Sequence, residues 1–381
     1  MPGGARGEPP GLLDRLRDEI VRTGPITFAR FMELALHDPR QGYYARGPAR
    51  LGTGGDFFTA SDVGPAFGHC IARQLIEIDR KLGPFAPFDV LEFGSGRGLL
   101  ARDVLDALAR TDAALARRVR YRMIDRSEAM REAAQRLAPE GRAVSPDEVG
   151  GGHRGCILAV ELFDALPVHR VRRRNGRLIE IGISCDAEGR LAECEIEPGD
   201  DVRAWAERYG AAAEEGIEAE VAPSIAGQVA RMDRALDNGA WIVVDYGDRS
   251  ADLYVPARRR GTLLAYHEHA TSEDYLARVG EQDLTAHVNF SAIEDEASRR
   301  GIDVLGLTTQ DRFLVANGIL EAFDQDDPAA SYDPKRVKER MQAMQLIHPM
   351  GMGRTFKVML LAKGCPRAPA LDGLRDPFSR S

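Results

Sequence analysis

The hydrophobic positions of the chain form short continuous runs and longer periodic stretches that follow one another. The continuous runs favour strands and lie at 88–93, 119–124, 142–144, 156–160, 240–244, 302–308 and 355–362. The periodic stretches that predict helices include 99–110, 128–137 and 223–237. Strands that alternate with helices are typical of a mostly parallel sheet covered on both faces. We therefore predict a doubly wound α/β fold with a seven-stranded sheet.

The first 82 residues predict a helical segment that precedes this sheet. Two helices are expected within 12–36, and a third is expected to run from an N-cap at Ser61 to about residue 81. A glycine-rich loop lies between them. A segment of this kind can close over a bound ligand, so we interpret residues 1–82 as an N-terminal lid. The residues expected to face the ligand are Tyr43, Tyr44, Asp56 and Phe57.

The predicted main domain spans residues 83–363 and contains three insertions, with 364–381 as a C-terminal tail. The first insertion, at about 168–222, has alternating hydrophobic positions and an Asn175-Gly176 turn, which predict antiparallel strands. The second lies at 248–285, and the third, at about 311–345, is predicted to be helical.

Charge and cysteine content narrow the class of protein. The net charge of −8 does not indicate a nucleic-acid partner, and no apolar run has the roughly 18 residues that a membrane span needs. The arginine-rich run at 170–177 is interpreted as the solvated rim of a hairpin, with a docking patch for an acidic partner as the alternative. The five cysteines include no CxxC pair and the N-terminus does not resemble a signal or transit peptide, so we expect free thiols in a cytoplasmic protein.

A glycine-rich turn follows the first predicted strand of the sheet. The sequence Glu92-Phe-Gly94-Ser-Gly96-Arg-Gly98 joins this strand to a helix, so glycines allow a tight turn and close approach of a ligand. A P-loop would continue with Gly-Lys-Ser/Thr, and a dinucleotide site would have Gly or Ala where Leu99 stands. S-adenosylmethionine fits what remains, because it carries a carboxylate but no pyrophosphate.

Asp125 strengthens this interpretation. It ends the second predicted strand, where a carboxylate can accept hydrogen bonds from both ribose hydroxyls of a bound nucleoside. The alternative is a glycine-rich structural turn beside a surface aspartate.

Two acids follow the fourth predicted strand. Glu161 and Asp164 stand three residues apart, next to the edge where ligands bind in an open α/β sheet. A carboxylate pair there can hold a cationic group such as a guanidinium. The alternative is that Asp164 caps a helix and Glu161 faces solvent.

Other polar residues give weaker indications. His267, His269 and His287 have no acid or thiolate at metal-ligand spacing, so no metal site is expected. Asp283 or Thr285 is predicted to cap a helix that begins nearby. The chain has no Gly-x-Ser-x-Gly motif and therefore no hydrolase signature.

The motifs together resemble those of the MidA-like methyltransferases, whose mitochondrial members act as protein arginine methyltransferases in complex I assembly. The resemblance covers about residues 12–363. The stretches that carry it are Ile26–Met32, Gly42–Tyr44, Gly55–Ser61, Leu91–Gly98, Glu161–Val168, Asp245–Gly247, Gly261–Tyr266, Asp283–Phe290 and Met352–Val358. The family pattern differs at three places here, where Val160 replaces Asn, Ser95 replaces Pro, and the segment after Tyr266 reads His-Glu-His.

This resemblance implies a methyltransferase sheet and a cleft with two halves. The cofactor-binding residues are expected to be Glu92, Gly94, Gly96, Gly98, Asp125 and Asp56. The catalytic residues are expected to be Glu161, Asp164 and His287, with His287 relaying the released proton. The predicted activity is methyl transfer from S-adenosyl-L-methionine to an arginine of a protein substrate. A small-molecule acceptor and a weakly active assembly factor are the alternatives.

Overall fold

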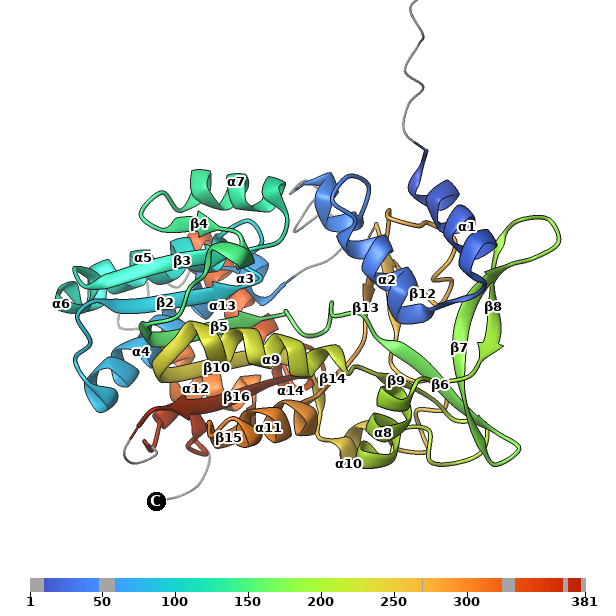
Figure 1. Ribbon diagram of the computed structural model, residues 1–381. Coiled ribbons are helices and arrows are strands. Elements are labelled where there is room, and N and C mark those ends of the chain that lie inside the picture. The colour runs from blue at the N-terminus through green and yellow to red at the C-terminus, as the bar shows by residue number, and fades with distance from the viewer. Residues whose placement is uncertain (1–9, 48–58, 269, 324–332, 366–368, 378–381) are drawn as a thin grey trace, which may run out of the picture.

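The computed structural model describes residues 10–47, 59–268, 270–323, 333–365 and 369–377, arranged as a large α/β core beside a smaller lobe (Figure 1). The core sheet has the strand order β15-β16-β10-β5-β2-β3-β4, and a short strand, β14, pairs with β10. Its strands are β2 (Phe88–Phe93), β3 (Val119–Ile124), β4 (Arg142–Val144), β5 (His153–Val160), β10 (Leu236–Asp248), β14 (Val288–Asn289), β15 (Asp303–Thr309) and β16 (Phe356–Lys363). Only β16 runs antiparallel to its neighbours. The predicted seven-stranded, mostly parallel sheet is confirmed.

Helices cover both faces of this sheet, which explains why its central strands are apolar throughout. Val90 and Leu158 pack on one face, where the helices are α4 (Pro65–Leu82), α5 (Leu99–Thr111), α7 (Glu128–Leu137), α12 (Gln310–Ala316) and α13 (Pro334–Ile347). Leu91 and Ile157 pack on the other face, against α9 (Ser224–Ala235) and α11 (Phe290–Arg299). The order of strands creates the edge at which β2, β3, β5 and β10 all end.

The smaller lobe contains two antiparallel sheets. The first has the order β1-β7-β6-β9, with β8 paired to β7, and the second has the order β12-β11-β13. Their strands are β1 (Ile26–Thr27), β6 (His169–Arg174), β7 (Arg177–Cys185), β8 (Leu191–Ile196), β9 (Glu218–Val221), β11 (Leu264–His267), β12 (Ala270–Ser272) and β13 (Asp283–Thr285). Short helical elements occur in both parts of the molecule. They are α6 (Ala113–Ala116), α8 (Asp200–Tyr209), α10 (Ser250–Leu253), α14 (Met352–Thr355), η1 (Tyr43–Arg46), η3 (Pro146–Glu148), η4 (Ile319–Phe323) and η6 (Asp372–Leu374).

The N-terminal helices α1 (Leu12–Thr23) and α2 (Phe28–His37) pack within this smaller lobe. Leu16 and Phe28 are fully buried in one hydrophobic cluster with Ile183 of β7 and Leu263. Strand β1 also pairs with β7. The first two helices therefore share a core with the insertions, whereas α4 packs on the main sheet.

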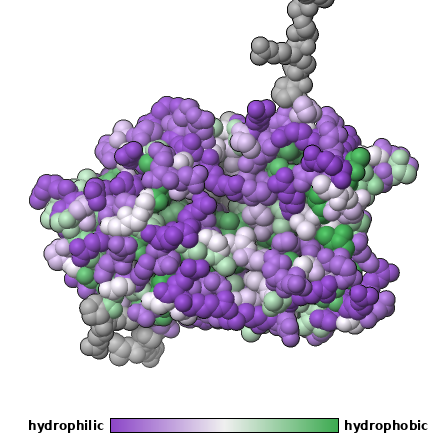
Figure 2. Space-filling view, viewed as in Figure 1, coloured by the Kyte–Doolittle hydropathy of each residue, from purple (hydrophilic) through white to green (hydrophobic). Residues whose placement is uncertain are grey.

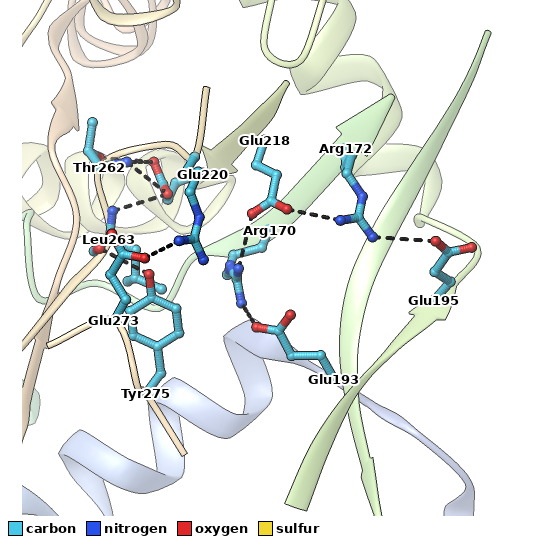
Figure 3. Close-up of polar contacts among 11 residues, drawn as sticks. Arg170, Arg172, Glu193, Glu195, Glu218, Glu220, Thr262, Leu263, Glu273 and Tyr275 are labelled. Atoms are coloured by element: carbon cyan, nitrogen blue, oxygen red, sulfur yellow. Dashed lines mark hydrogen bonds and ion pairs between the residues drawn. The ribbon is translucent and has the colours of Figure 1, made fainter. Parts of the chain in front are cut away.

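The tip of the arginine-rich run is the solvated rim of the β6–β7 hairpin, because Arg174 and Arg177 are exposed, whereas the start of the run is buried. Arg170 is buried between the rings of Phe28 and Tyr275, at 5.2 and 5.0 Å from their centroids. Its guanidinium forms ion pairs with Glu193 and, at 3.2 Å, with Glu218 (Figure 3). Arg172 pairs with Glu195 and Glu218, Arg174 with Glu195, and Arg177 with Glu197. Arg173 instead donates to the backbone carbonyls of Ala212 and Gly176. The cross-strand acids neutralise this run.

Two local predictions were wrong. Thr59, not Ser61, caps the helix that follows the glycine-rich loop, and that short helix, α3 (Ala60–Val63), ends before Pro65 begins α4. Residues Asp283–Thr285 form β13, and the helix begins at Phe290 after Asn289, whose side chain accepts a hydrogen bond from the N–H of Ala292. In both places the sequence contains more than one residue that can cap a helix, and the prediction chose the wrong one. All five cysteines are free, and no described helix is long and apolar enough to cross a membrane.

Candidate functional site

The glycine-rich turn lies at the carboxyl end of β2. Gly96 and Gly98 have φ angles of +50° and +80°, which glycine adopts without steric cost. A Cβ at Gly98 would lie 2.9 Å from Cα of Ala134, so this glycine allows α7 to pack closely. A Cβ at Gly96 would meet no atom within 4 Å. Gly96 therefore faces open space in which a ligand can approach the backbone.

Asp125 follows β3 and is bonded directly to this turn. Its carboxylate accepts hydrogen bonds from the N–H of Gly96 at 3.0 Å and from the N–H of Ser127 at 2.9 Å. Burial raises the pKa of Asp125 to about 6. A fixed carboxylate at the end of the second strand can accept hydrogen bonds from ribose hydroxyls, so the residues present fit S-adenosylmethionine.

The other three predicted cofactor residues differ from Gly96 and Asp125. Gly94 has a φ of +74°, and a Cβ there would lie 3.0 Å from Cδ1 of Leu162. Glu92 is buried within the sheet layer and accepts a hydrogen bond from the Tyr121 hydroxyl at 2.8 Å. Burial raises the pKa of Glu92 to about 8. Asp56 lies outside the described residues, and its predicted contact with the cofactor stays a prediction.

Glu161 begins the turn after β5 in a conformation that is rare for a residue with a side chain. Its φ is +50°, and its N–H donates to the carbonyl of Val244 at 2.9 Å. Oε1 accepts from the N–H of Ala60 at 2.7 Å, whereas Oε2 is buried without a hydrogen-bond partner among the described residues. Burial, followed by the charge of Asp164, raises the pKa of Glu161 well above its ordinary value.

Asp164 lies in the same turn and is 4% exposed. Its Oδ2 accepts a short hydrogen bond from the hydroxyl of Tyr246, and its Oδ1 has no partner among the described residues. Burial raises the pKa of Asp164 to about 6. Asp245 holds this turn in place, because its carboxylate accepts a hydrogen bond from the N–H of Phe163 at 2.9 Å. The same carboxylate accepts from the N–H of Tyr246 at 3.0 Å. The structure therefore brings Glu161 and Asp164 together, each with one oxygen available to a donor.

His287 lies beside this pair rather than in it. Its ring meets the ring of Tyr246 edge to face at 5.5 Å, and its backbone N–H donates to Oγ1 of Thr262 at 3.0 Å. Glu220 holds Thr262 in turn through the N–H and hydroxyl groups of that residue (Figure 3). Burial lowers the pKa of His287 to about 4, so its imidazole is neutral near pH 7.

Several residues without a predicted catalytic role line the same site. Asp245 and Tyr246 lie near the end of β10, which pairs with β5 so that Val244 lies opposite Val160. This parallel register, combined with an acid at the end of each strand, was the signal that could have placed them beside Glu161. Tyr44 and Asp283 come from the smaller lobe, and no local pattern in the sequence indicated that they meet.

Tyr44 joins the two halves of the site. Its hydroxyl donates to Asp283 of β13 at 3.0 Å, and its carbonyl accepts from the Ser127 hydroxyl at 2.9 Å. Ser127 is the residue whose N–H binds Asp125. The space-filling view shows a hollow between the core and the smaller lobe (Figure 2). The closure of this segment over a bound ligand stays a prediction, and Phe57 lies outside the described residues.

The geometry is that of two unlike sites at one sheet edge. Backbone groups and one carboxylate lie at the glycine turn, and several buried carboxylates lie at the next strand. No group of three metal-ligating side chains lies close enough to hold an ion among the described residues, which do not include His269.

Comparisons with known proteins identify the family of the chain. A model of the family described as "Putative S-adenosyl-L-methionine-dependent methyltransferase" matches residues 70–308. A protein from Burkholderia thailandensis, solved with S-adenosyl-homocysteine bound, is 31% identical with a TM-score of 0.85 and covers 95% of this chain and 94% of its own. The relative "Protein arginine methyltransferase NDUFAF7 homolog, mitochondrial" from Drosophila melanogaster is 29% identical over 80% of this chain and 74% of its own. The human protein of that name is 26% identical over 92% and 83%.

These relatives correct one expectation. The predicted cytoplasmic location is contradicted, because the Drosophila, zebrafish and human relatives are all named as mitochondrial proteins. Cysteine usage and the composition of the first residues were insufficient grounds for that inference. The resemblance to the MidA-like methyltransferases is confirmed, because the family model spans more than half of the chain and the B. thailandensis structure matches almost all of it. The chain therefore belongs to the family of S-adenosyl-L-methionine-dependent methyltransferases, and S-adenosyl-L-methionine is its cofactor.

Proposed function

We propose that this methyltransferase transfers the methyl group to an arginine side chain of a protein substrate. The observation that carries the proposal is the pair Glu161 and Asp164, each of which has a buried carboxylate oxygen without a partner among the described residues. A buried carboxylate needs compensation by a hydrogen-bond donor, preferably a cationic one. A guanidinium supplies several donors in one plane and stays charged near neutral pH.

The names of the relatives support the same acceptor. The Drosophila, zebrafish and human proteins are each named protein arginine methyltransferases. Tyr246 and Tyr44 add a second line of support, because each donates a hydroxyl hydrogen bond to an acid of the site. The acids are thereby held in place before an acceptor arrives.

The side chains have three tasks in this reaction. When bound, S-adenosylmethionine supplies a methyl group on a positively charged sulfur. Glu161 and Asp164 orient the guanidinium so that one nitrogen points at that methyl group, and alignment of this kind can contribute about 7–11 kcal/mol. The same carboxylates offset the positive charge of the acceptor.

The released proton goes to a carboxylate of the pair in this proposal. The pKa of Asp164 is raised to about 6 and that of Glu161 is raised further above its ordinary value, which makes each a stronger base than an exposed acid. His287, whose pKa is lowered to about 4, is a weaker base than either carboxylate. In this proposal the proton therefore stays on the pair until the product leaves, and His287 packs on Tyr246 as a neutral neighbour.

The test is incubation of the purified protein with S-adenosylmethionine labelled in the methyl group and cell extract. We expect label in protein and, after acid hydrolysis, in methylarginine. A parallel reaction with Glu161→Gln controls for label added by enzymes of the extract. Label confined to small molecules, or to another amino acid, would contradict the proposal.

A further inference from the structure

Exposed apolar side chains are concentrated on one part of the molecule. Seven large hydrophobic residues are exposed in the described part of the chain, and five of these lie between positions 320 and 350. They are Leu320, Val337, Met341, Met344 and Met350, with exposures of 45%, 40%, 69%, 48% and 90%. Singly scattered apolar residues need no explanation, but a group of this kind marks an interaction surface.

Three of these residues form a stripe along α13. Val337, Met341 and Met344 are separated by four and three positions, so they share one face of the helix. Ala343 and Leu346 on the opposite face are fully buried. Helix α13 therefore has two apolar sides, one packed against the core and one exposed to solvent. Methionine suits such a surface because it adapts to the shape of a partner.

The charge of α13 is opposite to that of the whole protein. The helix contains Lys335, Arg336, Lys338 and Arg340 against the single acid Glu339, which gives +4 − 1 = +3, whereas the chain carries −8. Arg336 and Lys338 are exposed and lie about 100° to either side of Val337. Neither forms an ion pair with a described residue, in contrast to the arginines of β6. The stripe is therefore flanked by cations that are available to an acidic partner.

A cavity of about 270 Å³ lies between this helix and α4. Its walls include Ala66 and Cys70 of α4, Ile319 of η4, and Glu339 and Gln342 of α13. Glu339 and Gln342 lie on the inward side of α13, and none of Val337, Met341 and Met344 lines this cavity. The exposed stripe itself is therefore the part of the helix that a partner can reach.

The short helix α3 connects α13 with Glu161, one of the two carboxylates proposed to bind the methyl acceptor. Helix α13 contacts α3 and α4 on the same face of the sheet (Figure 1). Gly64, at the end of α3, lies so close to Gln342 that a Cβ would be 2.6 Å from its Oε1. At the start of α3, the N–H of Ala60 holds Glu161.

We propose that Val337, Met341, Met344 and the flanking Arg336 and Lys338, here called the α13 surface, dock the protein substrate. The partner segment is an amphipathic helix whose apolar face is flanked by acidic residues, separate from the arginine that is methylated. Helices with apolar side chains three and four positions apart dock on grooves and faces of this kind. The identification of the partner as the substrate rests on the proposed function.

The test measures binding of defined peptides without methyl transfer. A fluorescent helical peptide of about 18 residues, with leucines at positions i, i+4 and i+7 flanked by glutamates, is titrated with the full-length protein. A second peptide has the same leucines flanked by lysines. We expect the glutamate peptide to bind at least about tenfold more tightly than the lysine peptide. Met341→Glu is expected to lower affinity for the glutamate peptide about tenfold or more, and the double variant Arg336→Glu/Lys338→Glu is expected to remove the preference.

Val21→Glu is the matched control, because Val21 is an 82% exposed apolar residue on α1. This variant is expected to bind as the wild type does, and circular dichroism checks that all variants fold. Equal binding of both peptides, unchanged binding by Met341→Glu, or binding to phosphatidylserine vesicles but to neither peptide would overturn the docking proposal.

A second arm separates this proposal from the arginine assignment. Where the extract assay labels proteins, Met341→Glu is expected to reduce their labelling while leaving methylation of a short arginine peptide unchanged. Equal loss on both acceptors would overturn docking. Label in lysine with peptide binding intact would instead contradict the arginine assignment alone.

Discussion

The two halves of the candidate site are built by different physical means. The proposed cofactor half is built from backbone conformation, because Gly96 faces open space and its N–H donates to the Asp125 carboxylate. The proposed acceptor half is built from side chains, because Glu161 and Asp164 bring buried carboxylates together with Tyr246. The first half comes from two adjacent strands, whereas the second takes residues from the core and from the smaller lobe.

This difference suggests where stability and activity conflict. Asp125 in the proposed cofactor half also has a raised pKa, but both of its carboxylate oxygens accept hydrogen bonds from backbone N–H groups of Gly96 and Ser127. Several buried acids close together raise one another's pKa values and destabilise the fold until a cation compensates them. Substitutions in the two halves are therefore expected to have opposite signatures.

The largest expected effect is that of Glu161→Gln on turnover. The amide keeps the shape and removes the charge that orients the acceptor, so we expect a loss of roughly 10²-fold or more in kcat. Calorimetry with S-adenosyl-homocysteine should give an unchanged Kd. The control is Glu128→Gln, at an exposed position of α7. Wild-type turnover in Glu161→Gln would mean that this carboxylate does not hold the acceptor.

Asp125→Ala is expected to weaken cofactor binding, which Glu161→Gln is expected to leave unchanged. Loss of charge-assisted hydrogen bonds to the ribose is expected to cost about 1.5–3 kcal/mol, or roughly 10- to 150-fold in affinity for the cofactor. The same calorimetric titration measures it. If the folded variant binds S-adenosyl-homocysteine as the wild type does, the ribose lies elsewhere.

The glycines separate ligand approach from packing. Gly96→Ala and Gly98→Ala each place a side chain at a positive φ, which costs about 1–2 kcal/mol. Only at Gly98 does the new Cβ also meet backbone, at 2.9 Å from Ala134 Cα. We expect Gly98→Ala to lower Tm by more than Gly96→Ala, and Gly96→Ala to lose cofactor affinity although its Cβ clashes with no protein atom. Equal melting temperatures would contradict the packing role of Gly98.

The same division governs what could be predicted from the sequence. The position of the proposed cofactor half was predictable because strand, turn and helix are consecutive in the sequence, and the predicted strands at 88–93 and 119–124 match β2 and β3. Glu161 and Asp164 were predictable for the same reason. Their contacts with Ala60 and Tyr246 were not, because the pairing of distant segments leaves no local periodicity. The ion pairs of Arg170, Arg172 and Arg174 in β6 could not be predicted either, because their acidic partners are more than 20 residues away in the sequence.

The smallest expected effect, and the most direct test of conflict in the acceptor half, is the pH dependence of stability in Asp164→Asn. Burial raises the pKa of Asp164 from its ordinary 3.8 to about 6 in the folded protein. Below about pH 4 the carboxyl is protonated in both states and costs nothing. As pH rises to about 6, the unfolded chain loses the proton first, so folding is progressively penalised, and above about pH 6 the penalty is constant.

Asparagine removes this penalty and still offers an oxygen to the Tyr246 hydroxyl. The difference in Tm between variant and wild type should therefore be near zero at pH 4 and reach a plateau of a few degrees in favour of the variant at pH 7. Asp147→Asn, at an exposed position of η3, should show no such trend. A variant less stable than the wild type at pH 7 would mean that the ionised Asp164 strengthens the fold through Tyr246, and that the acceptor half is stable without its cation.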